Sequence, residues 1–284
     1  MIYSEFDCAE QISEVENKKQ LIEMLNVLTK YCDKHGVRYY LSGGTLLGAI
    51  RHKGFIPWDD DVDINIPRPD LEKLFFISNG KIENLILTQP NDLSFGRDCQ
   101  FYKLYNPMYL LQDTRGGALK NNYLYYPLNI DIFPIDGFPK GKIKNAIFCR
   151  KLIVLRKLVG IASYKKIIGK NKFTYLLHMF LYLPVKLMGR ERLVRWYQKY
   201  ASKYNFNQSE WVGVTTVVHY IFGECVKKQD YIKPVEVEFE GNQYHAPGNY
   251  DTYLSQLYGD YMKLPPKEKQ VSLHGIKVFK RKEV

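Results

Sequence analysis

The residues best suited to chemistry in this 284-residue chain are carboxylates spaced two apart near position 60. Asp59, Asp61 and Asp63 occupy alternate positions, and the residues between them are apolar from position 62 onward. Successive side chains of a strand point to opposite faces. A strand here would therefore direct Asp61, Asp63 and Asn65 away from the core, with Asp59 on the same side and Asp60 on the other.

Carboxylates held side by side repel each other unless a cation neutralises them. Ligand sets made only of oxygen suit hard divalent ions, so the pattern predicts Mg²⁺ or Mn²⁺. A calcium loop of the EF-hand type also begins with Asp at alternate positions, but it needs Gly at the sixth. Counted from Asp59, that position is Ile64, which excludes an EF-hand.

A further carboxylate lies in a later apolar segment, LNIDIF, at residues 128–133. Ile130 and Ile132 alternate with Asp131, so Asp131 should also face away from the core, across from Asp61 and Asp63. Three carboxylates from two adjacent strands are typical of two-metal phosphoryl transfer.

Upstream, the segment SGGT at residues 42–45 stands where a predicted strand turns into a helix. Gly43 and Gly44 let a backbone approach a phosphate closely, and the free N–H groups of a helix start attract anions. Each motif alone is common. Together, in this order, they predict a catalytic metal site.

The run SGGTLLGAIRHKGFIPWDDDVD, residues 42–63, closely resembles the LicD family, which includes bacterial phosphocholine transferases and, as distant animal relatives, fukutin and the fukutin-related protein. The later runs APGNY (246–250) and LYGDYMKLPP (257–266) are also similar to that family. The resemblance spans about residues 21–274, but no motif in the basic middle of the chain matches.

The resemblance implies a nucleotidyltransferase fold and transfer of a phospho-alcohol from a CDP-linked donor to a glycan. It implies four metal ligands, Asp59, Asp61, Asp63 and Asp131, of which the last three are also the catalytic carboxylates. It further implies residues that contact the donor phosphates or the acceptor: Ser42, Gly43, Gly44, Thr45, Arg51, His52 and Lys53.

In this reading a sugar hydroxyl attacks the distal phosphorus in line, and CMP leaves. Asp131 or another carboxylate takes the hydroxyl proton. The transferred group is phosphocholine first, or glycerol or ribitol phosphate. Trp58 is a candidate wall of a choline cage, with core packing as its alternative and more usual role. Two rivals remain: an Asp-x-Asp glycosyltransferase, and a nucleotidyltransferase acting on nucleic acid or a small molecule with a nucleoside triphosphate.

The elements that must position these residues can be read from apolar periodicity. Helices are expected over residues 11–35, 46–52, 69–77 and 250–258, and strands over 37–41, 61–66, 85–88, 99–105, 109–112 and 128–133, with a hairpin at 235–244. Residues 141–205 read as helical, with breaks near Gly160, Gly169 and Pro184.

This order predicts an α+β fold, with a nucleotidyltransferase-like core of mixed or antiparallel sheet and flanking helices plus a basic helical subdomain. The expected division is a catalytic core at 1–139, a basic helical insertion at 140–205, and a C-terminal part at 206–284 that completes the catalytic domain.

The net charge of +11 is uneven. Residues 140–205 hold seventeen Lys and Arg but a single acid, Glu191, so this segment is +16 and the remainder −5. Such a segment could contact an anionic membrane, bind nucleic acid, or be a solvated face. Lipid-linked glycan acceptors favour the membrane and make nucleic acid the less expected partner.

The apolar stretch 173–189 is interrupted by His178, Pro184 and Lys186, so it predicts a core or interfacial helix instead of a membrane span. The five scattered cysteines form no CxxC pair, which argues against a disulfide framework and a structural zinc site. The N-terminal residues show no secretory signal. We therefore expect a cytoplasmic protein at the inner face of the plasma membrane.

Overall fold

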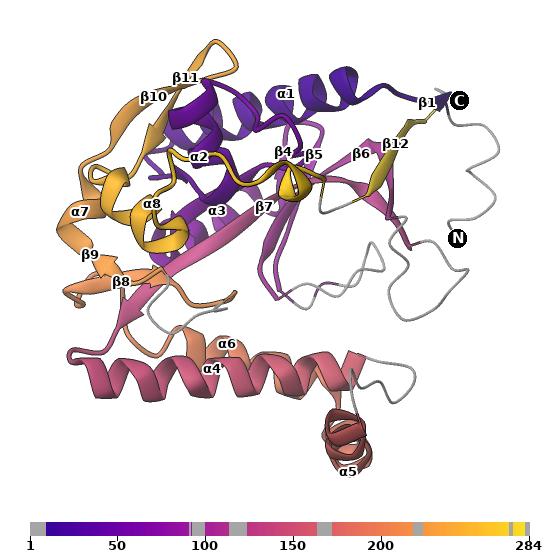
Figure 1. Ribbon diagram of the computed structural model, residues 1–284, viewed down its shortest axis with the longest axis vertical. Helices are drawn as coiled ribbons and strands as arrows, with labels where there is room; N and C mark the ends of the chain where they lie inside the picture. The colour runs from indigo at the N-terminus through magenta and orange to yellow at the C-terminus, as the bar shows by residue number, and fades with distance from the viewer. Residues whose placement is uncertain are drawn as a thin grey trace.

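The computed structural model describes residues 10–90, 92, 100–113, 124–163, 172–217, 224–272 and 275–281. Its centre is a mixed sheet with the order β1-β12-β6-β7-β3-β2 (Figure 1). Strands β5 and β4 extend the sheet from β6, and β8 and β9 extend it from β7. Strands β3 and β7 run parallel, and the other pairs are antiparallel.

The strands of this sheet are β1 (Glu10–Gln11), β2 (Tyr40–Leu41), β3 (Asp63–Pro67), β4 (Lys81–Ile82), β5 (Leu85–Thr88), β6 (Tyr102–Asp113), β7 (Leu124–Phe138), β8 (Trp211–Val214), β9 (Val226–Lys227) and β12 (Ile276–Lys280). A separate hairpin consists of β10 (Val235–Phe239) and β11 (Asn242–Ala246). The helices are α1 (Glu14–Lys34), α2 (Gly43–His52), α3 (Arg68–Ser78), α4 (Lys142–Ser163), α5 (Lys172–Met188), α6 (Arg190–Ala201), α7 (Lys228–Ile232) and α8 (Tyr250–Tyr258), with a short 3₁₀ turn at Lys267–Lys269.

Helix α1 illustrates why the local sequence folds as it does. The Ser13 hydroxyl accepts a hydrogen bond from the Glu16 N–H at 3.1 Å, which caps the helix start. Leu21, Leu25 and Leu28 recur on one face and are completely buried against the sheet. The prediction of a helix over 11–35 is therefore confirmed to within a few residues.

Three expected boundaries were wrong. Strand β3 begins at Asp63 instead of 61, and residues 99–105 and 109–112 are not two strands: the described part forms the single strand β6, with a bulge between Asn106 and Leu110. Helix α2 begins at Gly43 instead of 46. Its first N–H groups therefore belong to the glycines themselves.

Two of the breaks expected in the basic middle were also misplaced. Gly160 lies inside α4, and α5 continues through Pro184, whose ring faces outward while Val185 is buried. Packing of α5 against α4 outweighs the backbone hydrogen bond that proline removes. The chain turns instead at Gly189, with φ of 78°, and Gly169 lies outside the described residues.

Two groups of buried side chains hold the fold together. The larger surrounds the sheet, and the smaller lies between α4 and α6, around Phe148, Leu152 and Tyr197. Phe138 and Cys225, which lie outside 140–205, belong to the smaller group. The helical segment thus packs directly on the end of β7, and the proposed domain division stays a prediction.

An ion pair joins α3 to β7. The Nε and Nη2 groups of Arg68 each donate to one carboxylate oxygen of Asp136 on β7. The Thr215 hydroxyl donates to the same carboxylate at 2.6 Å. Asp136 is buried, so the ion pair neutralises charges that would otherwise be costly to bury.

Within the described residues, no helix is both long and apolar enough to span a membrane.

Candidate active site

A cleft of about 990 Å³ opens where β3, the start of α2, α8 and the following loop 259–266 meet. Its wall includes Asp59, Asp61 and Asp63 together with Gly43 and Gly44. The two motifs that are separate in the sequence therefore face one space. This volume suits a nucleotide-sized ligand.

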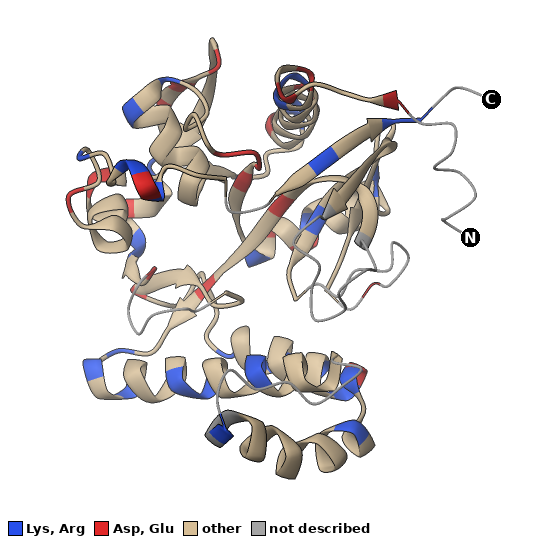
Figure 2. Cartoon of the chain, turned by 45° about the vertical axis from the view of Figure 1, so that its right-hand side comes forward, with Lys and Arg blue, Asp and Glu red and all other residues tan. Residues whose placement is uncertain are grey.

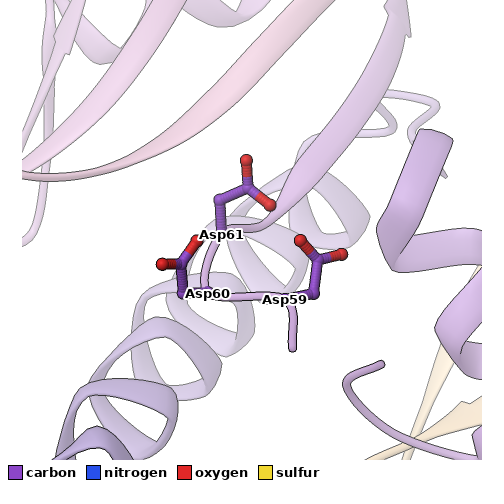
Figure 3. Close-up of side chains that lie close together, drawn as sticks. All are labelled: Asp59, Asp60 and Asp61. Carbon is purple, nitrogen blue, oxygen red and sulfur yellow. The ribbon is translucent and has the colours of Figure 1, made fainter. Parts of the chain in front are cut away.

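The loop ahead of β3 gathers three carboxylates. Ligand oxygens of Asp59, Asp60 and Asp61 lie within 4.8 Å of one another (Figure 3). The expectation that Asp60 points to the opposite side was wrong, because the strand begins only at Asp63 and residues 59–62 do not alternate as a strand. Asp60 differs in another way: its carboxylate accepts from the Ser272 hydroxyl at 2.9 Å, and it does not line the cleft.

Asp131 lies directly beside Asp63, since the two residues are register partners in the parallel pair β3–β7. Its Oδ1 accepts from the Lys103 ammonium and from the Asn129 amide, the latter at 2.7 Å. Lys103 is only 2% exposed and is Asp131's register partner on β6. Both contacts use Oδ1, so Oδ2 is the oxygen that we expect to meet a cation.

The neighbouring carboxylates and Lys103 all affect the pKa of the Asp63 carboxyl. Burial raises the pKa of the Asp63 carboxyl well above its usual range, and the charges of Asp61, Asp131 and Asp59 raise it further. Lys103 lowers this pKa in part. An oxygen-only donor set with such mutual repulsion is of the kind that suits a hard divalent cation.

Glycine is required at the start of α2. A Cβ on Gly44 would stand 2.5 Å from the Asp59 carboxylate, and one on Gly43 would stand 3.1 Å from Asp63 Oδ2. Gly43 also adopts a φ of 51°, which favours glycine. The helix start and the carboxylates are thus in contact, without side chains between them.

This contact gives a first prediction. In Gly44→Ala the fold should persist while the Asp59 carboxylate is displaced, because a side-chain end moves more easily than a backbone. A displacement of this size should lower turnover about a hundredfold. The matched control is Gly160→Ala, where a Cβ meets nothing within 4 Å. Equal activity of the two variants would contradict the role of Gly44.

The hydroxyl groups beside the glycines have structural partners. The Ser42 and Tyr253 hydroxyls are hydrogen-bonded at 3.0 Å, and Thr45 Oγ1 accepts from the Asp63 N–H at 2.9 Å. Thr45, expected to touch donor phosphates, is buried and does not line the cleft. Its observed contact fixes β3 relative to α2.

The three basic residues that end α2 are not equivalent. Arg51 lines the cleft, and its guanidinium donates to the Tyr261 carbonyl at 2.8 Å and to His52 Nε2 at 2.9 Å. His52 and Lys53 do not line the cleft. Burial and the Arg51 charge lower the pKa of His52.

Four cleft or near-cleft residues were missed in the sequence. Lys103 lies beside Asp131, and Glu224, Tyr253 and Tyr258 line the cleft. Burial raises the pKa of Glu224 to about 8, although the Tyr253 hydroxyl, which donates to it at 3.5 Å, opposes this. Tyr258 lies within the LYGDYMKLPP run, whereas nothing near Glu224 in the sequence signals a function.

A mixed sheet that places paired carboxylates against a glycine-rich helix start defines a nucleotidyltransferase-type site for phosphoryl transfer. Residues 36–138 match the family model described as LicD/FKTN/FKRP, nucleotidyltransferase domain. Residues 36–138 are therefore similar to the nucleotidyltransferase domain of the LicD family, which confirms the resemblance and the α+β fold predicted from the sequence.

Curated relatives agree with this assignment. The chain is 28% identical over 268 residues to the lipopolysaccharide cholinephosphotransferase LicD of Haemophilus influenzae, covering 90% of this chain and 95% of that protein. It is 61% identical over 36 residues to the human ribitol 5-phosphate transferase FKRP, or 13% of this chain and 7% of that protein. An uncharacterized protein of Rickettsia prowazekii is 42% identical over 50 residues, 18% of this chain and 19% of that protein.

Proposed function

We propose that this chain is a metal-dependent phosphotransferase that moves a phospho-alcohol from a CDP-linked donor to a cell-surface glycan or its precursor. The observation that carries the proposal is the contact, in one cleft, between the glycine start of α2 and the carboxylates at and just before the start of β3. Similarity to a cholinephosphotransferase along nearly the whole chain supports the same reaction class over a glycosyl or nucleic-acid transfer.

Asp59, Asp61, Asp63 and Asp131 would hold Mg²⁺ or Mn²⁺, which when bound would neutralise the diphosphate and the leaving CMP. The N–H groups at the start of α2 would face the donor phosphates. Arg51 adds a positive charge on the same wall, and its contacts to Tyr261 and His52 hold its side chain in place.

In the transfer step the acceptor oxygen forms a bond to the distal phosphorus, the bond from phosphorus to the CMP oxygen breaks, and the acceptor proton must leave. We assign that proton to Glu224, which lines the cleft. Asp131, the earlier candidate, already accepts from Lys103 and Asn129. A carboxylate whose pKa lies near the working pH is the more effective base.

Phosphocholine is the alcohol phosphate that the cleft supports best. Trp58, Tyr258 and Tyr261 line it together with the acidic Asp260. Aromatic faces and a nearby carboxylate attract a quaternary ammonium group, whereas glycerol or ribitol would call for hydrogen-bonding side chains. The cholinephosphotransferase relative supports this choice.

The test is to incubate the protein with Mg²⁺ and CDP-choline, CDP-ribitol, CDP-glycerol or nucleoside triphosphates, and to measure CMP or pyrophosphate release. We expect CMP from CDP-choline above all. Pyrophosphate release from a nucleoside triphosphate, with no CMP from any CDP-alcohol, would overturn the proposal in favour of a nucleotidyltransferase.

The second prediction concerns the metal. Activity should disappear in EDTA and return with Mg²⁺ or Mn²⁺. Because Asp63 has a raised pKa, a cation must displace its proton, so Mg²⁺ should bind more tightly as the pH rises. Calorimetry in buffers of different ionisation enthalpy measures that proton release. Full activity in chelator would refute the metal mechanism.

A location at the cytoplasmic face of the plasma membrane is part of the same proposal. Glycan precursors are commonly lipid-linked while inside the cell, and the +16 segment suits an anionic surface.

A further inference from the structure

Helix α5 presents a continuous apolar stripe to solvent. Leu176, Phe180, Leu183 and Leu187 follow steps of four, three and four, and they are between 41 and 79% exposed. Val185, on the opposite side of the helix, is buried in the core shared with α4 and α6. The stripe is thus the outward face of a packed helix, and no described residue covers it.

The surroundings of this stripe are basic. Helix α5 lies farthest from the sheet (Figure 1). The helices between it and the sheet, α4 and α6, carry many Lys and Arg (Figure 2). A hollow of about 430 Å³ at the turn from α5 to α6 is lined by Arg190, Arg192 and Arg195 together with a single acid, Glu191. Apolar side chains at the tip with cations set around them are the arrangement of an interfacial helix.

We infer that α5 docks the protein on an anionic lipid surface by lying in the boundary between head groups and acyl chains. Its seventeen residues would extend about 25 Å along the membrane plane. Charge excludes the main competing occupants. A second copy packed through α5 would bring two +16 segments together, and a nucleic acid offers no apolar layer for the stripe.

The cleft lies one helix away from this surface. Cys149 of α4 lines the cleft, and α5 packs on α4. Docking through α5 would therefore bring the cleft near lipid-linked molecules. The inference deepens the membrane location included in the proposed function, and it rests on exposure and charge and not on the proposed reaction.

The test compares two double variants of the full chain with equal charge change. Phe180→Glu with Leu187→Glu removes the tip of the stripe. The matched control, Val15→Glu with Phe76→Glu, removes apolar groups that are 80 and 85% exposed on α1 and α3. Binding is measured by co-sedimentation with vesicles of phosphatidylglycerol and phosphatidylcholine at physiological salt, and with phosphatidylcholine vesicles and duplex RNA in parallel.

We expect the unmodified protein and the control to bind the mixed vesicles, and the α5 variant to bind at least tenfold more weakly. In Phe180→Trp the added indole emission should shift to the blue on binding, which reports insertion instead of adhesion. Equal binding of the two double variants, tight binding to RNA without vesicles, or a dimer that only the α5 variant breaks would each overturn the inference. CMP release in solution, expected to be the same in all variants, separates its failure from failure of the proposed function.

Discussion

Asp63→Asn should abolish transfer and leave a protein that is folded and, without metal, more stable than the original. Turnover should fall on the order of a thousandfold or more, since the side chain at the centre of the carboxylate group loses its charge. The fold should persist because Thr45 binds the Asp63 backbone N–H and not its side chain. Asp61→Ala should behave in the same way.

The stability change has a defined sign with pH. The folded pKa of Asp63 lies above its unfolded value, so the folded state retains a proton that the unfolded state has lost. Stability therefore falls as the pH rises above the unfolded pKa, and Asp63→Asn removes that loss. Thermal unfolding in EDTA should show the variant's advantage growing from acid to neutral pH. Loss of folding in both Asp63 and Asp61 variants would contradict the site assignment.

Asp131→Asn should show that Asp131 differs from Asp63, its register partner, in its effect on stability. It should also lose activity, but it should destabilise the fold by about 3 kcal/mol, because it removes the partner of the buried Lys103. A second change, Lys103→Met, should restore stability but not activity. The control is Asp60→Ala, expected to be mild because Asp60 contacts Ser272 and lies off the cleft wall.

Local periodicity predicted the elements that stand alone. The helix at residues 11–35, the hairpin at 235–244 and the helix at 250–258 all exist, because capping residues, alternation and glycine stops act within a few positions. The pairing of strands that lie far apart in the sequence could not be predicted from such local signals. Strand β12 pairs with β6, more than 160 residues earlier, and its apolar pattern does not reveal that partner.

The same division applies to the site. Strand alternation predicted that Asp131 and Asp63 both face away from the core, and the same alternation in β6 would have added Lys103. Alternation failed at Asp60, where the chain is still a loop. Glu224 reaches the cleft only through the packing of α8, whose Tyr253 donates to it, so no short-range pattern could reveal it.

Glu224→Gln should lower kcat by about 10² to 10⁴-fold and remove the pH dependence that this group imposes on the reaction. In the original protein, turnover should rise as the pH rises to about 8, because Glu224 accepts a proton only once it is ionised. Binding of the CDP-linked donor should change little, since the substitution keeps the shape of the side chain. A pH profile of kcat, with donor affinity measured in parallel, tests both statements.

The raised pKa of Glu224 also affects the stability of the fold. Its folded pKa lies above the unfolded value, so between about 4.5 and 8 the folded state retains the proton and stability falls with rising pH. Glu224→Gln should therefore be more stable than the original at alkaline pH and similar to it in acid. Asp260→Asn, which removes another carboxylate of the same cleft, should keep the pH profile of kcat. If Glu224→Gln retains both the rate and the pH profile, the acceptor proton leaves by another route and Glu224 is not the base.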